Sequence, residues 1–254
     1  MATETELPEE TPWLSIVIPA KNESGNIDLV VDGIVEACAA HAPYEIIYID
    51  DGSTDDTAAR VLAKAETYPF VRLIQHDQSG GQSAAVHSGV HAARGSVICT
   101  LDADGQNPPS EIPKLIACLD GRSFPEGVAL VAGQRVGRQD TASKRWASKA
   151  ANAIRGKLLK DNTRDTGCGL KLFRREAFLA FPYFDHMHRY LPALAGRDGW
   201  QVLHTDVAHA QRHAGTSNYA NLGRALAGVY DLIGVVWLLK RRKKAQGVET
   251  RGTK

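Results

Sequence analysis

Short hydrophobic runs alternate with amphipathic segments along the first hundred residues of the chain. The runs have the length of buried β-strands, and the segments between them carry apolar residues at helical spacing. Strands that alternate with helices of ten or more residues predict a mostly parallel sheet with right-handed crossovers. The predicted strands are 13–19, 44–49, 70–75 and 97–101.

The second half continues this pattern with shorter elements. A hydrophobic run predicts a strand at 128–133, a glycine-rich turn leads into another strand that ends at Phe173, and a further strand or two follow at 200–209. Helices are predicted at 112–119, 145–159, 175–181 and 222–239.

Length and composition predict a globular α/β protein. The chain has 254 residues, of which 43% are hydrophobic, enough for an ordinary core. Thirty basic and twenty-nine acidic residues leave a formal charge of +1, so no electrostatic field favours nucleic acid as a partner. The expected organisation is a disordered segment at 1–11, one domain at 12–220, an amphipathic helix with a basic end at 221–244 and a disordered tail at 245–254.

The cysteines and the apolar runs indicate a cellular compartment. Cys38, Cys99, Cys118 and Cys168 are scattered without a CxxC pair, which is typical of reduced thiols in a cytosolic protein. No secretory leader and no run of about eighteen uncharged apolar residues is found, so we expect a cytoplasmic protein without a transmembrane span.

Two carboxylates follow the strand at 97–101. Asp102 and Asp104 are two residues apart, and such positions on an extended chain project to the same face. Together with the amide oxygen of Gln106 they provide the oxygen ligands that Mg²⁺ and Mn²⁺ prefer. An Asp-x-Asp turn is also an ordinary way to end a strand, so this motif alone leaves both interpretations open.

A second acidic turn, at 50–57, follows the strand at 44–49. It could bind a ribose hydroxyl, or it could be a turn in which Ser53 or Thr54 caps the next helix. The first turn lacks a GxGxxG pattern, and the sequence lacks a phosphate loop that ends in Lys-Ser or Lys-Thr. A dinucleotide-dependent dehydrogenase and a P-loop nucleotidase are therefore disfavoured.

Taken together, five motifs resemble the family-2 inverting glycosyltransferases of GT-A fold. Within that family they look most like the polyprenol-phosphate group, typified by dolichol-phosphate mannosyltransferase. The resemblance extends over residues 13–244 and implies a Rossmann-like, mostly parallel sheet with helices on both faces. The motifs, in chain order, are 19–23, 50–57, 102–106, 165–171 and 211–217.

The resemblance also implies a donor site. The residues that it assigns to the nucleotide are Pro19, Ala20, Asn22, Glu23, Asp51, Ser53 and Asp102. Those that it assigns to a divalent cation are Asp102, Asp104 and Gln106, with Mg²⁺ or Mn²⁺ as the cofactor. Arg212 would clamp the diphosphate of a GDP- or UDP-sugar, so Asp104 and Arg212 count as catalytic residues. Gly81-Gln82-Ser83 and Asn218 depart from the family, which often carries cations there.

The same resemblance implies an acceptor site for a lipid phosphate. A phosphate is already an anion and needs cations, whereas a sugar hydroxyl would need a general base. The implied cation cluster, with one hydroxyl, is Arg135, Lys144, Arg145 and Ser148. The alternative is a solvated helix face. Asp165 could act as an acid–base or positioning group, or it could belong to an ordinary turn.

Two apolar stretches could contact a membrane surface, as a lipid acceptor requires. They are 186–194 and 222–239, and the second runs into the cations of 240–244. Asp231 argues against a membrane-spanning helix. The alternative is a core or dimer helix. Relatives often continue into transmembrane helices, whereas none is predicted in this sequence. We therefore expect a peripheral protein on the cytoplasmic face or one that relies on a membrane-protein partner.

The sequence thus predicts transfer of a sugar from a nucleotide donor to polyprenyl phosphate with inversion. A first alternative is a family-2 transferase that acts on a soluble or growing glycan, although the Gln-x-x-Arg-Trp motif typical of polymerising relatives is missing. A second is a silent donor-binding scaffold at a membrane. The intact pair of Asp102 and Asp104 argues against that second alternative.

Overall fold

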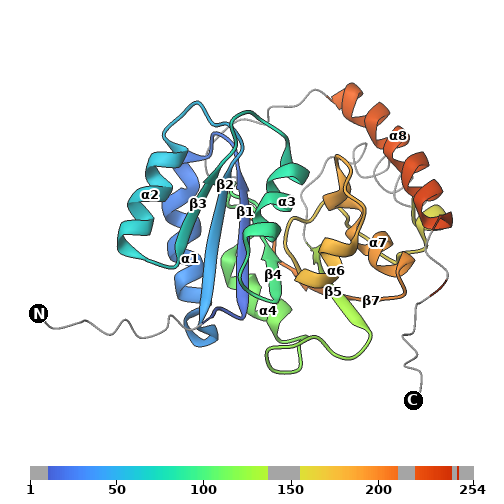
Figure 1. Cartoon of the computed structure of the whole chain (residues 1–254), viewed down its shortest axis with the longest axis horizontal. Coiled ribbons are helices and arrows are strands. Elements are labelled where there is room, and N and C mark those ends of the chain that lie inside the picture. Colours follow the sequence, from blue (N-terminus) through green and yellow to red (C-terminus); the bar gives the residue numbers. More distant parts are fainter. Residues whose placement is uncertain (1–10, 137–154, 211–220, 242–244, 246–254) are drawn as a thin grey trace, which may run out of the picture.

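The computed structural model describes residues 11–136, 155–210, 221–241 and 245, and for 221–227 it describes the backbone alone. Seven strands of this described part form one sheet in the order β3-β2-β1-β4-β6-β5-β7 (Figure 1). β6 is antiparallel to both of its neighbours, and all other pairs are parallel. The strands are β1 (Leu14–Ala20), β2 (Tyr44–Asp50), β3 (Val71–Gln75), β4 (Val97–Thr100), β5 (Val128–Arg135), β6 (Lys171–Arg174) and β7 (Gln201–Val207).

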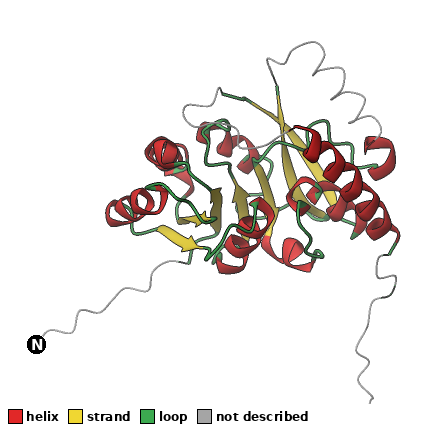
Figure 2. Ribbon diagram, turned by 90° about the horizontal axis from the view of Figure 1, so that it is seen from above, coloured by secondary structure: helices red, strands yellow, loops and turns green. Residues whose placement is uncertain are grey.

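Helices cover both faces of the sheet (Figure 2). Hydrophobic side chains of α1, α2 and α4 pack on one face, and those of α3, α6 and α7 pack on the other. The helices are α1 (Ile27–Ala37), α2 (Thr57–Thr67), α3 (Gln82–Ala92), α4 (Ile112–Ile116), α6 (Arg175–Ala180), α7 (Leu191–Arg197) and α8 (Asn221–Lys240). The short 3₁₀ turns are η1 (Ser24–Asn26), η2 (Ala39–His41), η3 (Pro109–Glu111) and η4 (Met187–Arg189).

The close packing of α3 on the sheet depends on Gly89. A Cβ atom at this position would lie 2.4 Å from Val17 Cγ1 and 2.6 Å from Ile49 Cδ1. Any larger residue would therefore push α3 away from β1 and β2. Since α3 begins at Gln82, this packing also fixes the loop before the helix at the carboxyl ends of those strands.

β1 is the strand at which the strand order changes direction, because the strands that follow β3 are added on the other side of β1. It pairs with β2 on one side and with β4 on the other, so the loops that follow β1 and β4 diverge. In open α/β sheets a ligand crevice forms at the carboxyl ends of the strands at such a point. The sheet order therefore gathers the predicted polar motifs at one edge.

The predicted parallel sheet and its flanking helices are confirmed, with element ends shifted by a few residues. The alternative in which Ser53 or Thr54 caps the next helix is wrong, because α2 begins later, at Thr57, after Asp56. Of the predicted helix 145–159 only 155–159 lies in the described part, where it is helical.

The prediction that the stretch 186–194 contacts a membrane surface is wrong. Met187 is 1% exposed, Leu191 2% and Leu194 0%, and all three belong to the core under α3. The apolar periodicity of this stretch is therefore explained by packing against the sheet. Among the described residues no helix combines the length and the hydropathy that crossing a bilayer requires.

Candidate active site

A cavity of about 570 Å³ opens at the carboxyl edge of the sheet. Its wall combines residues at or just after the ends of β1, β2, β4 and β5 with the start of α3, the segment that leads into β6, and η4. Most of the site residues expected from the sequence line it, namely Pro19, Ala20, Glu23, Asp51, Asp102, Asp104, Gln106 and Arg135.

Asp51 is held on the cavity wall by four donors. The backbone N–H groups of Gly80 and Gly81 donate to its carboxylate over 2.7 and 2.9 Å, and Ser79 Oγ donates over 2.8 Å. His76 Nδ1 lies 2.8 Å from Oδ1. Burial raises the pKa of Asp51, but these hydrogen bonds outweigh it and lower the pKa below its ordinary value. Asp51 therefore stays ionised and fixes the loop before α3.

Asn22 and Ser53 join the loops after β1 and β2. The backbone N–H of Asn22 donates to Ser53 Oγ over 2.9 Å, and the backbone N–H of Thr54 donates to Asn22 Oδ1 over 2.8 Å. Neither Asn22 nor Ser53 is among the residues that line the cavity. The structure thus gives these two residues a bridging role between loops, and leaves Pro19, Ala20 and Glu23 on the wall.

Asp102 and Asp104 lie in a turn after β4, which ends at Thr100. The side-chain amides of Gln82 and Asn107 donate to the two oxygens of Asp102 over 2.8 and 3.0 Å. The backbone N–H of Gln106 donates to Asp104 Oδ1 over 3.0 Å. The amides therefore fix the direction of the Asp102 carboxylate without neutralising its charge.

The charges at this turn fit a divalent cation. Burial, followed by the negative charge of Asp104, raises the pKa of Asp102 above its ordinary value. A cation between the carboxylates would relieve that repulsion, and Asp102, Asp104 and Gln106 supply only oxygen ligands, as Mg²⁺ and Mn²⁺ prefer. Within the described residues no cluster of three or more histidine, cysteine, aspartate or glutamate side chains could hold a metal ion, so this site would depend on two carboxylates and one amide oxygen.

Gly169 lies directly beside the carboxylate group of Asp102. A Cβ atom at this position would lie 2.1 Å from Asp102 Oδ2 and 2.3 Å from Cγ. Thr100 Oγ1 donates to the Gly169 carbonyl over 2.7 Å and so keeps this backbone in place. The residue at 169 must have no side chain if Asp102 is to keep its position.

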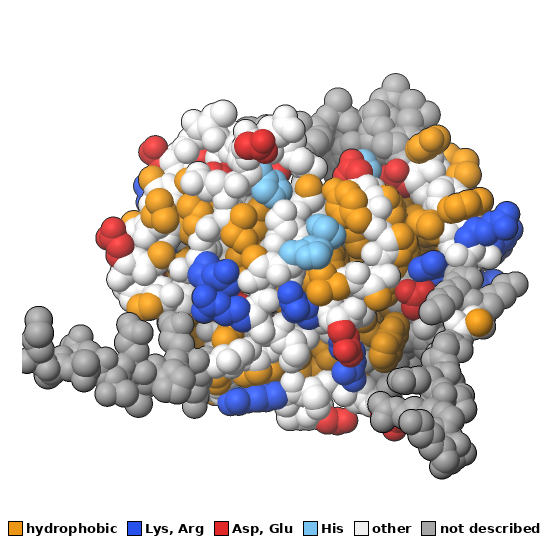
Figure 3. Space-filling view, in the orientation of Figure 1, with side chains coloured by type: hydrophobic (Ala, Val, Ile, Leu, Met, Phe, Trp, Pro, Cys, Tyr) orange, Lys and Arg blue, Asp and Glu red, His pale blue; other side chains and the backbone are white. Residues whose placement is uncertain are grey.

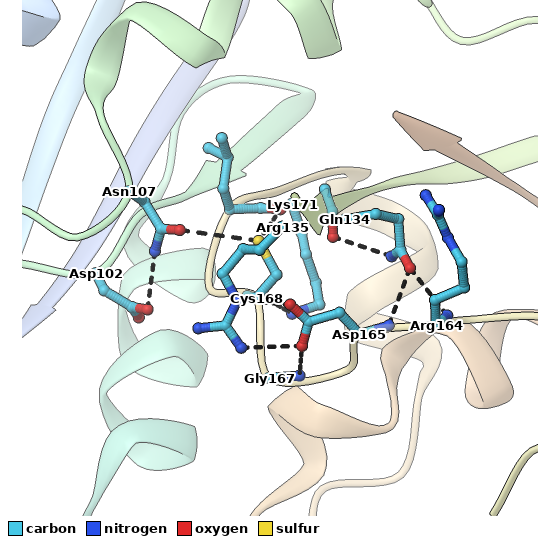
Figure 4. A network of polar contacts seen from close by, with 11 residues as sticks. Asp102, Asn107, Gln134, Arg135, Arg164, Asp165, Gly167, Cys168 and Lys171 are labelled. Atoms are coloured by element: carbon cyan, nitrogen blue, oxygen red, sulfur yellow. Dashed lines mark hydrogen bonds and ion pairs between the residues drawn. The ribbon is translucent and has the colours of Figure 1, made fainter. Parts of the chain in front are cut away.

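Arg135 and Asp165 form a two-point ion pair at the end of β5 (Figure 4). The Nε and Nη2 atoms of Arg135 donate to Asp165 over 2.5 and 2.9 Å. The backbone N–H groups of Arg164 and Asp165 both donate to Gln134 Oε1, over 2.9 and 3.0 Å. Gln134 is 1% exposed. Asp165 therefore orients the Arg135 guanidinium on the cavity wall, and it also accepts the backbone N–H of Gly167 over 3.1 Å within its own turn.

Lys171, His188 and Arg189 are among the wall residues that were not assigned a role from the sequence. Lys171 is 3% exposed and its ammonium donates to the Cys168 carbonyl. Burial, followed by the charges of Lys171 and Arg189, lowers the pKa of His188 well below its ordinary value, so its ring is neutral. His188 and Arg189 could have been suspected from the sequence because they are polar residues within the otherwise apolar stretch 186–194.

Four of the expected site residues lie outside the described residues. They are Lys144, Arg145, Ser148 and Arg212.

Comparison with known proteins places the chain in a family. The profile of glycosyl transferase family 2 matches residues 15–180. The undecaprenyl-phosphate 4-deoxy-4-formamido-L-arabinose transferase of Photorhabdus laumondii is 33% identical over 228 residues, which are 89% of this chain and 68% of that protein. The protein of the same name from Pseudomonas savastanoi pv. phaseolicola is 34% identical over 89% of this chain and 66% of its own length. The chain thus spans about two thirds of these relatives.

Among solved structures, the fold is similar to that of glucosyl-3-phosphoglycerate synthase from Mycobacterium tuberculosis. The complex of that enzyme with Mn²⁺, UDP and glucosyl-3-phosphoglycerate gives a TM-score of 0.67 at 20% identity, covering 90% of this chain and 80% of the other. The complex with Mg²⁺ and UDP also gives 0.67 at 20% identity, covering 90% and 79%. At this identity the likeness establishes the fold.

Proposed function

Because the chain belongs to glycosyl transferase family 2, we propose that it transfers a sugar from a nucleotide-sugar donor to a polyprenyl phosphate. An oxygen of the lipid phosphate attacks the anomeric carbon, and the bond from that carbon to the nucleoside diphosphate breaks with inversion. The products are a polyprenyl-phospho-sugar and a nucleoside diphosphate. The relatives that match 89% of the chain are named for transfer to undecaprenyl phosphate.

The single observation that supports this acceptor best is the Arg135–Asp165 pair beside the carboxylates of Asp102 and Asp104. A hydroxyl acceptor needs a carboxylate that can take its proton. Asp165, one such carboxylate, is engaged by a guanidinium at 2.5 and 2.9 Å. A lipid phosphate needs no base, and an oriented guanidinium suits its oxygens. By family resemblance we add Lys144, Arg145 and Ser148 to this acceptor site.

For the donor, we assign the nucleoside to the wall formed by Pro19, Ala20, Glu23 and Asp51. Asp102, Asp104 and Gln106 would hold Mg²⁺ or Mn²⁺. When bound there, the cation offsets the negative charge of the diphosphate that departs. By resemblance we assign Arg212 to the same diphosphate.

A substrate panel tests the proposal. Purified protein is incubated with UDP- and GDP-sugars and Mn²⁺, with undecaprenyl phosphate, with a soluble glycan or with neither acceptor, and release of nucleoside diphosphate and formation of the glycosylated acceptor are measured. We expect release that depends on the lipid phosphate. Transfer to a soluble glycan alone would favour the first alternative acceptor, and tight donor binding without any turnover would favour a silent scaffold.

Replacement of Arg135 by alanine is expected to raise the KM for the lipid phosphate about tenfold or more, because it removes a two-point, charge-assisted donor. The KM for the donor should change far less. Both are obtained from initial rates with one substrate varied at a time. Asp165→Asn should shift the lipid KM in the same direction by less, since it loosens the guanidinium without removing it. An unchanged lipid KM in both variants would mean that the acceptor phosphate binds elsewhere.

The proposal includes a peripheral position on the cytoplasmic face of a membrane, bound through α8. One side of this helix packs on α7 and on Leu159, with Val235 1% exposed. The opposite side exposes four large apolar residues, and Figure 3 shows hydrophobic side chains along α8 that end in basic ones. The exposed set is Val229 at 59%, Tyr230 at 81%, Ile233 at 66% and Trp237 at 58%.

The double substitution Ile233→Glu and Trp237→Glu is expected to weaken binding to phosphatidylglycerol vesicles at least about tenfold, because each apolar side chain contributes about 1.5–3 kcal/mol when buried. Co-sedimentation measures the bound fraction. Leu62→Glu is the matched control, since Leu62 on α2 is also about half exposed, at 52%, but lies away from α8. Equal loss in both variants would contradict a specific role for α8.

A further inference from the structure

Arg189 is a cation on the cavity wall that the proposed function leaves without a role. It ends η4, the short turn between α6 and α7. Resting on the proposed function, we propose that the Arg189 guanidinium binds the phosphate of the lipid acceptor and guides it from the α8 side of the cavity toward the anomeric carbon.

The backbone around Arg189 is fixed from the side of α3. The backbone N–H of His188 donates to Ser83 Oγ over 3.3 Å, and the Nδ1 atom of the same histidine lies 2.7 Å from that oxygen. Ser83 is fully buried. The turn therefore keeps its position relative to the loop that orients Asp51 and relative to Gln82, which contacts Asp102.

The same turn is fixed from the side of α8. His186 Nδ1 lies 2.8 Å from Asp231 Oδ2, and Tyr190 Oη donates to the Gly228 carbonyl over 3.5 Å. The flanking residues of Arg189 thus touch the helix whose opposite side is the exposed apolar surface. A lipid whose chain stays in the membrane must present its phosphate to the cavity from this side.

The guanidinium itself is available for a ligand. Throughout the described part of the chain, Arg189 forms no side-chain hydrogen bond or ion pair that would occupy it. Of the cations near it, Arg135 is oriented by its pair with Asp165 and Lys171 donates to the Cys168 carbonyl, so Arg189 adds to Arg135 a second guanidinium that no described residue engages. Lys21 also lines the cavity, but it follows β1 next to Pro19 and Ala20, on the nucleoside side. A half-buried guanidinium offers a phosphate paired donors of fixed geometry.

The test compares Arg189→Gln and Arg189→Lys with the wild type. We expect Arg189→Gln to raise the KM for undecaprenyl phosphate about tenfold or more, with the donor KM within about twofold and vesicle binding unchanged. Arg189→Lys should recover part of the loss, because it keeps the charge but not the paired donors. Arg60→Gln serves as the control, since Arg60 is an exposed arginine that pairs with Asp28 on the far helices. Thermal unfolding verifies that each variant is folded.

A binding measurement without turnover completes the test. Farnesyl phosphate, titrated calorimetrically into metal-loaded protein with UDP, should bind more weakly to Arg189→Gln than to wild type by a similar factor. An unchanged lipid KM would overturn the proposal, and so would a rise in the donor KM alone, which would assign Arg189 to the donor diphosphate. Loss of vesicle binding would make it a membrane contact instead. Failure of the proposed function is distinguishable, because then the wild type itself would not glycosylate the lipid phosphate.

Discussion

Gly169→Ala is expected to reduce sugar transfer at least about 100-fold, although it removes no functional group from the site. The added Cβ would lie 2.1 Å from Asp102 Oδ2, whereas ordinary contact begins near 3.4 Å. The carboxylate must therefore move by about 1 Å or more. Misplacement of a catalytic group by about 1 Å can cost a factor of about 100 in rate.

The surrounding contacts prevent the backbone at Gly169 from absorbing the strain. Thr100 Oγ1 holds the Gly169 carbonyl at 2.7 Å, and Lys171, two residues later, begins β6 between β4 and β5. Asp102 is the more movable partner, because it lies in a turn after β4 and is held by two amides. The substitution should therefore displace the carboxylate and leave the sheet in place.

The variant is assayed for glycolipid formation and for Mn²⁺ affinity, and we expect both to fall. Gly196→Ala is the matched control, since Gly196 is an exposed glycine of α7 with no atom within 4 Å of an added Cβ. It should retain wild-type activity. Wild-type rates in Gly169→Ala would contradict a fixed Asp102, and an unfolded variant would be recognised by its circular dichroism spectrum.

The importance of Gly169 could not be read from the sequence. Its backbone φ is not in the left-handed region, so no turn type requires a glycine there. The requirement comes from the approach of β6 to the turn after β4, two segments far apart along the chain. The hydrophobic runs, in contrast, predict the strands well, because burial on both faces is a local property of each run.

The stretch 186–194 illustrates a second limit. Its apolar periodicity fits both a core helix and a membrane-surface helix, and only the tertiary packing of Met187, Leu191 and Leu194 against the sheet distinguishes them. For the same reason His188 and Arg189 were not assigned to the site. The residues that follow β1, β2 and β4 were easier to predict, because parallel strands bring their carboxyl ends to one edge.

Asp102→Asn is expected to reduce transfer at least about 1,000-fold, because a cation that offsets the diphosphate charge is worth several kcal/mol of transition-state stabilisation. In the wild type, Mn²⁺ should raise the melting temperature, since binding to the folded state alone stabilises it. That rise should be absent in the variant. Asp32→Asn, at an exposed carboxylate of α1, is the control and should behave as wild type.

Stability without metal supplies an independent readout of the same carboxylate. Burial and Asp104 raise the pKa of Asp102 in the folded protein above its unfolded value of about 3.9. A raised pKa means that the protonated form stabilises the fold below the unfolded pKa, and that this contribution is lost as pH rises through the folded pKa. Asparagine carries no charge at any pH and avoids that loss.

The stability of Asp102→Asn relative to metal-free wild type should therefore increase as pH rises from about 4 to 7. Gln82 can turn toward solvent to accommodate the new amide, because its side chain is exposed, whereas Asn107 keeps its hydrogen bond to the remaining oxygen. Saturating Mn²⁺ should reverse the order at neutral pH, since the cation relieves the repulsion in the wild type alone. A stability difference that is independent of both pH and metal would refute the assignment of Asp102 as a ligand.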